Sequence, residues 1–203
     1  GGCTSCGMPE WSVNPVNMNL QVTDTPMWWD APYGPDIHLT LTYNSLDSLG
    51  SIRPFGDKWS FAYAAYAMED PSGAVIIMYG NGYTERYTPK AGGGYTSQAR
   101  HAETTLTKTG AYSYVVEDGD GEKWTFSVPT TMQGASAASL LTALADKFGT
   151  TVSIGHNSQG AITTVSHSAL PAGQNTWTLA YGPNGKVATI TDPWARDCTF
   201  SYD

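Results

Sequence analysis

Cysteine has the widest chemistry of any residue type in this sequence, and it occurs three times. Cys3 and Cys6 form a C-x-x-C pair, and Cys198 lies near the other end of the chain. Any two of them could form a disulfide in an oxidising compartment, or three thiolates and a distant histidine could hold zinc. A thioredoxin-like motif would need a βαβ context, and haem attachment would need a histidine where Gly7 stands. A disulfide and a thiol that links to another chain remain open, while the single C-x-x-C pair makes zinc the less favoured alternative.

A group of aromatic residues and carboxylates has the composition of a carbohydrate-binding site. Its aromatic members are Trp28, Trp29 and Tyr33, and its acidic members are Asp24, Asp30 and Asp36. Aromatic rings stack on the faces of sugars, while carboxylates accept hydrogen bonds from sugar hydroxyls. A loop held by packed indole rings would explain the same residues, and the nearby prolines argue against a central strand. We interpret the segment as such a loop and keep carbohydrate binding as a functional hypothesis.

The densest run of carboxylates is EDGDGE at residues 117–122. An EF-hand loop beginning at Asp118 would need glycine at its sixth position, where Lys123 stands. Asp-Gly pairs are typical of hairpin turns, so we predict a turn. A glycosidase pair would need two carboxylates across a cleft, which the spacing in sequence does not define.

Other catalytic patterns are absent from the sequence. The four histidines, His38, His101, His156 and His167, share no metal-ligand spacing. No G-x-S-x-G motif occurs, and the glycine run at 92–94 is not followed by the lysine-bearing helix of a phosphate loop. We therefore predict no catalytic residue, no cofactor and no metal site.

The composition limits the class of protein. The chain has 203 residues, enough for one domain with a substantial core. Its net charge of −8 argues against nucleic-acid binding by phosphate neutralisation. No apolar stretch approaches the length of a membrane-spanning helix. Only 14% of residues are charged, while glycine and tyrosine are abundant, as is typical of a sheet protein.

Period-two alternation predicts the strands that carry these residues. Residues 177–203 read as strand, turn, strand, turn and a third strand in which Cys198, Phe200 and Tyr202 share a face. Residues 152–165 repeat the pattern of 177–190, with their turn glycines 25 positions apart. Further strands are expected at 38–43, 58–63, 74–79, 112–116 and 123–128. Residues 135–146 have helical propensity, but the repeat context favours a strand.

A set of short motifs lies in a fixed order along the chain. They are NPVN at 14–17, LTLTYNS at 39–45, PFGDKWSF at 54–61, DGDG at 118–121, and the closing turns with Arg196 and FSYD at 200–203. The ordered set resembles the amino-terminal region of bacterial Rhs/YD-repeat proteins. Ala195-Arg196 departs from the family's Gly-Arg, and His156-Asn157 departs from its Tyr-Asp. Only two or three repeats are present, against the long arrays of the family.

The resemblance implies an all-β fold with little or no helix. The expected architecture is a twisted, antiparallel strip of YD-type hairpins, shell-like or sandwich-like. We divide the chain into a tail at 1–13, an Rhs-type amino-terminal β region at 14–130, and YD-repeat-like hairpins at 131–203. We expect the chain to be too short to close a shell and to lack the family's self-cleaving core and toxin domain. It would then be a fragment, a minimal relative, or a subunit whose copies continue the sheet.

The expected function is that of a non-catalytic structural module at the cell surface or outside the cell. Open strand edges recruit further strands unless they are blocked. The last residues read as a strand without a cap, so we expect an assembly edge at Cys198, Thr199, Phe200, Ser201, Tyr202 and Asp203. The expected partners are copies of the chain in a filament or polymer, or the continuation of a longer YD-repeat chain. Binding of cell-surface glycans is the alternative function.

Overall fold

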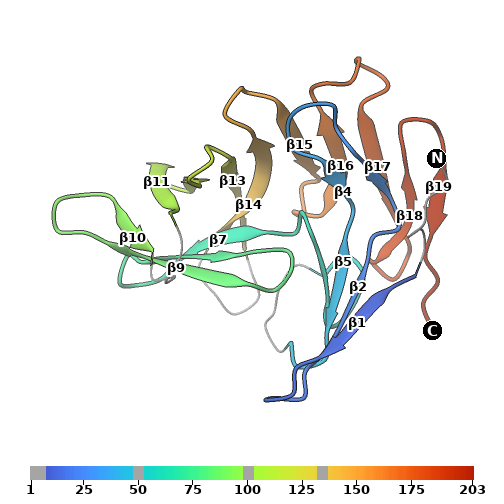
Figure 1. Ribbon diagram of the computed structural model, residues 1–203, viewed down its shortest axis with the longest axis horizontal. Helices are drawn as coiled ribbons and strands as arrows, with labels where there is room; N and C mark the ends of the chain where they lie inside the picture. Colours follow the sequence, from blue (N-terminus) through green and yellow to red (C-terminus); the bar gives the residue numbers. More distant parts are fainter. Residues whose placement is uncertain (1–7, 48–52, 98–102, 132–136) are drawn as a thin grey trace.

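The computed structural model describes residues 8–47, 53–97, 103–131 and 137–203, and these residues are folded as antiparallel β-sheets (Figure 1). They contain nineteen strands. The prediction of an all-β class is confirmed. In this part of the chain, no helix has the length and hydropathy needed to cross a bilayer.

Two small sheets are built from the amino-terminal third of the described residues. The four-stranded sheet contains, in spatial order, β1 (Glu10–Val13), β2 (Leu20–Asp24), β5 (Leu41–Asn44) and β6 (Trp59–Phe61). The two-stranded sheet contains β3 (Trp28–Trp29) and β4 (Ile37–His38). A short strand thus forms at Trp28–Trp29, where the sequence predicted a loop.

The third sheet has thirteen strands. Its main path is, in spatial order, β10 (Tyr95–Ser97), β9 (Thr84–Pro89), β8 (Val75–Met78), β7 (Tyr66–Glu69), β14 (Ala137–Ala145), β15 (Thr151–His156), β16 (Ile162–His167), β17 (Thr176–Tyr181), β18 (Val187–Thr191) and β19 (Asp197–Thr199). A branch continues from β14 through β13 (Lys123–Thr131), β12 (Ser113–Glu117) and β11 (Thr105–Gly110).

The sheet branches at β14 because one edge of this strand pairs with two different strands. One edge of β14 pairs with β13 along its length. The other edge pairs with β7 through residues 138–140 and with β15 through residues 143–145. The Leu141 N–H between these segments donates to the Ala65 C=O at 3.0 Å. The strands β7–β9 therefore run in a different direction from β15–β18 (Figure 1).

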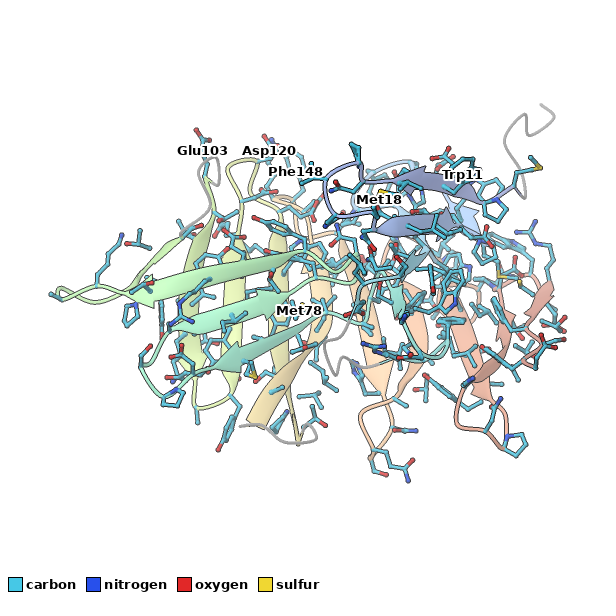
Figure 2. All side chains as sticks on the ribbon, turned by 90° about the horizontal axis from the view of Figure 1, so that it is seen from below. Trp11, Met18, Met78, Glu103, Asp120 and Phe148 are labelled. Carbon is cyan, nitrogen blue, oxygen red and sulfur yellow. The ribbon has the colours of Figure 1, made fainter. Side chains whose placement is uncertain are left out.

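The small sheets and the large sheet enclose a common core. Figure 2 shows the four-stranded sheet, whose strand β1 carries Trp11, lying over the strands of the carboxy-terminal hairpins. One cluster of fully buried side chains joins Ile37 and Phe61 of the small sheets to Val165, Trp177 and Ile190 of the large sheet. Burial of apolar surface contributes about 25 cal/mol per Å². The shared core therefore holds the small sheets and the large sheet together.

Two of the expected boundaries fall inside strands. β1 begins at Glu10, within the segment expected to be a tail. The expected boundary at 130/131 lies within β13, which pairs with β12 and β14. Residues 137–145, whose helical propensity competed with the repeat pattern, form β14, so tertiary pairing overrides propensity here.

The strand predicted at 38–43 is interrupted. β4 ends at His38 and β5 begins at Leu41. Between them the Leu39 N–H donates to the Met27 C=O, while the Thr40 C=O accepts from the Ala62 N–H. The chain changes partners from the β3 side to the β6 side at this point, which the uninterrupted alternation of the sequence did not reveal.

Eight hairpin turns share one hydrogen-bond pattern. In each, the N–H of the first residue donates to the C=O of the fifth, and the N–H of the fourth donates to the C=O of the first. The fourth residue always has a positive φ. The turns are 70–74, 79–83, 90–94, 118–122, 146–150, 157–161, 182–186 and 192–196. The aligned glycines of the sequence repeat, Gly160 and Gly185, both occupy this fourth position.

Ala195 occupies the same position with a φ of 60°, although a side chain is disfavoured there. We expect Ala195→Gly to raise the free energy of unfolding by about 0.5–1 kcal/mol, after the entropy gained by the unfolded chain is subtracted. The matched control is Gly185→Ala, whose added Cβ would meet no atom within 4 Å and which should destabilise by about 1 kcal/mol. Urea unfolding of both variants tests this; a stabilising Gly185→Ala would contradict it.

A carboxylate at the first turn position stabilises several of these turns. The Asp70 Oδ1 atom accepts from the Ser72 and Ala74 N–H groups. Hydrogen bonds from Ser72, then Arg86, lower the Asp70 pKa to about 2. A lowered pKa means that the ionised form stabilises the fold. This contribution is complete above the ordinary pKa near 3.8 and is lost as the pH falls toward 2.

We therefore expect Asp70→Asn to be less stable than wild type near neutral pH, and the difference to shrink between about pH 5 and about pH 2. Asparagine keeps an acceptor oxygen but cannot ionise. Denaturant unfolding at a series of pH values measures the difference. A gap that stays constant across this range would contradict the assignment.

Candidate ligand-binding site beside Trp28

The hairpin of β3 and β4 presents one apolar face and one polar face. Trp28 pairs with His38, and Trp29 pairs with Ile37. Because side chains alternate along a strand, the two pairs point to opposite faces. Ile37 is completely buried, and the Trp29 ring packs edge-on against His167 at 4.9 Å between centroids. Trp28, on the other face, is 38% exposed.

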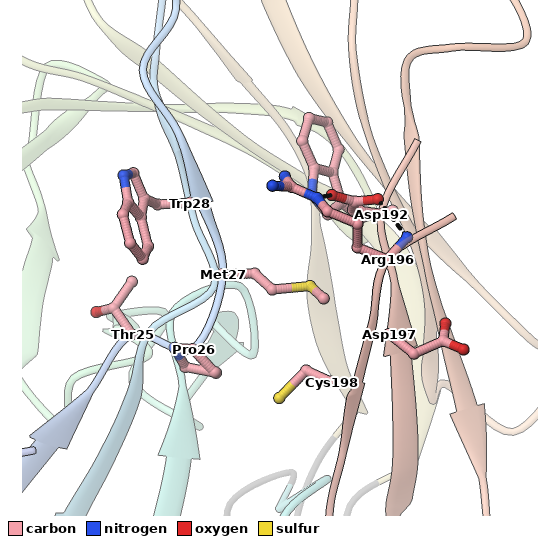
Figure 3. A pocket seen from close by; sticks show the side chains of 9 residues that line it. Thr25, Pro26, Met27, Trp28, Asp192, Arg196, Asp197 and Cys198 are labelled. Carbon is pink, nitrogen blue, oxygen red and sulfur yellow. Dashed lines mark hydrogen bonds and ion pairs between the residues drawn. The ribbon is translucent and has the colours of Figure 1, made fainter. Parts of the chain in front are cut away.

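A hollow of about 470 Å³ lies between Trp28 and the end of the large sheet. Figure 3 shows Thr25, Pro26 and Trp28 on one side and the residues of β19 and its preceding turn on the other, with Met27 reaching between them. The opposite wall contains Trp177, Asp192, Arg196, Asp197 and Cys198. This wall joins an aromatic ring, carboxylates and a guanidinium group.

A second hollow, of about 380 Å³, lies on another side of Trp28. Its acidic lining comes from Glu10 of β1, Asp24 of β2 and Asp30 next to β3, with His38 of β4 beside them. Trp28 therefore separates two open hollows, each of which contains hydrogen-bonding groups. This is the arrangement in which an aromatic ring can stack on a sugar while its hydroxyls meet polar side chains.

Hydrogen bonds fix the polar wall of the first hollow. Asp192 is 5% exposed. Its Oδ1 atom accepts from the N–H groups of Trp194 and Arg196, and its Oδ2 atom accepts from the Arg196 Nε–H at 2.5 Å. Burial raises the Asp192 pKa, but the hydrogen bonds from Arg196 outweigh it, and the pKa lies below its ordinary value. Asp192 therefore remains a carboxylate, and both of its oxygens accept hydrogen bonds from its own turn.

His167, beneath Trp29, is held as a neutral imidazole. Its Nε2–H donates to the Pro35 C=O at 2.8 Å, and its Nδ1 accepts from the Ala169 N–H at 3.0 Å. One donating and one accepting nitrogen define the neutral ring. Burial, which is the largest influence, lowers the His167 pKa despite the hydrogen bond to Pro35.

Cys198 is a free thiol at the first hollow. Burial, and then the nearby Asp24 carboxylate, raise its pKa above the ordinary value. A raised pKa keeps the sulfur as a thiol, which is a weak nucleophile and a weak metal ligand. Cys3 and Cys6 lie outside the described residues, so their pairing remains a prediction.

The structure divides the aromatic residues predicted to bind ligand. Trp28 lines the first hollow together with Arg196 and the second hollow together with Asp30. Trp29 is partly buried, packs against the core and lines neither hollow. Tyr33 is 61% exposed but does not line either hollow.

The predicted assembly edge is only partly a strand. β19 contains Asp197, Cys198 and Thr199, and it ends at Thr199. The following residues fold back onto the molecule: Phe200 packs against Phe55 at 5.0 Å between ring centroids, and the Tyr202 hydroxyl donates to the Val187 C=O at 2.7 Å. The third strand of the closing repeat is therefore shorter than the sequence predicted.

The acidic run at 117–122 forms one of the eight shared turns. The Asp118 Oδ1 atom accepts from the Asp120 and Glu122 N–H groups. The predicted hairpin turn is confirmed.

Glu85 is a buried carboxylate that the sequence analysis did not identify. It is 4% exposed and accepts hydrogen bonds from three hydroxyls. The donors are Tyr79, Ser97 and Thr104. Glu85 connects β9 to β10 and to the segment before β11, so hydrogen bonds within the fold account for its burial.

The sequence analysis also missed Arg196 and His38 as site residues. Arg196 follows Asp192 by four residues, and this spacing at a turn is a usable signal. His38 had no such signal, because its place beside Asp30 depends on the register of the hairpin. No protein-family model matches the sequence, and no curated protein matches it significantly.

Proposed function

We propose that this chain is a non-catalytic structural β module that assembles by adding a strand at the edge of β19. The observation that carries the proposal is the position of β19 at one end of the large sheet. An edge strand presents unpaired N–H and C=O groups, which form a template for another strand.

The register of β19 identifies which groups face outward. Cys198 pairs with Ile190, and the Phe200 N–H donates to the Ala188 C=O at 2.9 Å. Hydrogen-bonded and non-hydrogen-bonded pairs alternate in an antiparallel ladder. Asp197 and Thr199 therefore direct their main-chain groups away from β18, toward the free edge.

The surroundings of this edge support strand addition. The first hollow lies between β19 and the extended segment 25–28, with Asp197 and Cys198 on its wall. Of the devices that commonly block an edge, β19 lacks proline, lysine and a bulge in its pairing with β18, although it is only three residues long and carries the charged Asp197. An incoming strand would complete the hydrogen bonds of Asp197 and Thr199.

The repeated turn supports the wider context of the proposal. A strip of hairpins made with one recurring turn can be extended by further units of the same kind. We propose that the partner strand comes from another copy of the chain, as part of an extracellular or cell-surface assembly of the Rhs/YD-repeat type. The same edge could receive the continuation of a longer chain.

Carbohydrate binding beside Trp28 is the second candidate function. It is favoured by the exposed indole between two hollows that both contain hydrogen-bonding groups. This site and the β19 edge share the first hollow, so one surface could bind a glycan or a strand, but the two occupants require different groups.

We expect Thr199→Pro to prevent self-association, because proline removes the outward N–H while leaving the pairing of Cys198 intact. The matched control is Thr199→Val, which changes the side chain and keeps the N–H. Sedimentation velocity over a range of concentrations should show association of wild type and the valine variant, with the proline variant monomeric. A wild type that stays monomeric at high concentration, or a proline variant that associates equally, would refute edge assembly.

The carbohydrate hypothesis predicts that Trp28→Ala abolishes binding on a glycan array, since stacking on the indole is lost. Trp11→Ala is the control, because Trp11 is 73% exposed and lies on β1, where Figure 2 labels it at the outer surface. Equal glycan binding by wild type and Trp28→Ala, or no binding by wild type, would remove this candidate.

A further inference from the structure

We infer that Asp30, Asp36 and His38 form a binding site for a divalent metal ion of the zinc type. One ligand atom from each residue can be chosen so that all three atoms lie within 4.8 Å of one another. The inference is independent of the assembly proposed for β19, because the three residues belong to the β3–β4 hairpin.

The hairpin register brings the three side chains together. Trp29 and Ile37 form its last pair, so Asp30 and Asp36 extend from the ends of the two strands opposite each other. His38 is two residues beyond Asp36 and therefore points to the same face. The other face carries the completely buried Ile37 and the partly buried Trp29, which pack the hairpin against the core.

Two carboxylates placed opposite each other repel in the absence of a cation. The Asp36 Oδ1 atom accepts a hydrogen bond from the Ala31 N–H at 2.7 Å, which orients the carboxylate; among the described residues, no hydrogen bond to its Oδ2 atom is found. The side chain of Asp30 is 77% exposed and that of His38 is 52% exposed. A cation can therefore reach all three side chains from solvent.

The distance between two of the donors is close to that of neighbouring ligands on one metal ion. His38 Nε2 and Asp30 Oδ1 are 3.5 Å apart, which is long for a hydrogen bond. Zinc bonds of about 2.0–2.2 Å in a tetrahedron place neighbouring ligand atoms roughly 3.3 Å apart. Small side-chain rotations would bring the third donor into the same sphere.

The donor set selects the type of metal. An imidazole nitrogen with two carboxylate oxygens is typical of zinc and related transition metals. Calcium takes six to eight oxygen ligands, and this group offers a nitrogen and two carboxylates. The second hollow borders Asp30 and His38, so it has room for a water molecule in the fourth coordination position.

The test is isothermal titration of zinc chloride into the full chain with Cys3, Cys6 and Cys198 all changed to serine. This background removes the thiolates, which would otherwise bind zinc on their own. We expect one zinc ion per chain and no binding of calcium under the same conditions. His38→Gln and Asp36→Asn should each weaken zinc binding by about tenfold or more, as the loss of a ligand requires.

The matched control is Asp120→Asn. Asp120 is an exposed carboxylate at the turn after β12, away from the β1–β2 strands that border the second hollow (Figure 2), and its change should leave zinc binding unaltered. Circular dichroism of each variant verifies the fold. The inference would be overturned if the chain with all three cysteines changed to serine bound no zinc. It would also be overturned if His38→Gln and Asp36→Asn bound zinc as tightly as Asp120→Asn.

Discussion

The hydrogen bonds along one edge of β14 determine the shape of the molecule. Main-chain groups that leave water must find partners, and β14 supplies them to β7 at one end and to β15 at the other. A strand shared in this way forces the two neighbours apart. The carboxy-terminal hairpins consequently turn away from β7–β9, and the small sheets pack against them. The core, the hollows beside Trp28 and the β19 edge all follow from this divergence.

The candidate binding surfaces lie where the small sheets meet the carboxy-terminal hairpins. Trp29 packs against the core beneath the β3–β4 hairpin and contacts both His167 and Trp177. This anchoring leaves Trp28 and His38 on the opposite face, toward solvent. Because side chains alternate along β3 and β4, the apolar residues that pack on the core determine the position of the polar residues on the opposite face. The Asp192 turn places Arg196 on the facing wall by the same kind of local constraint.

The sequence was informative where structure is local. The turn glycines Gly160 and Gly185 revealed the recurring hairpin, and the departure at Ala195 marked a residue that does adopt the positive φ of its turn. The sequence was uninformative where a partner is distant. The break at Leu39 depends on a change of neighbouring strands, and the double pairing of β14 depends on residues about seventy positions away. The meeting of Asp30 with His38 depends on a loop register that residue spacing does not encode.

Asp197 and Thr199 direct their main-chain groups toward the free edge of β19, and we propose that these groups accept another strand. Hydrogen–deuterium exchange resolved to single amides tests this most directly, with dilute and concentrated protein compared. In dilute protein, the Cys198 amide should be protected by Ile190 while those of Asp197 and Thr199 exchange rapidly, and in concentrated protein all three should be protected. Equal protection of the three amides in dilute protein, or rapid exchange of Asp197 and Thr199 at every concentration, would contradict the account.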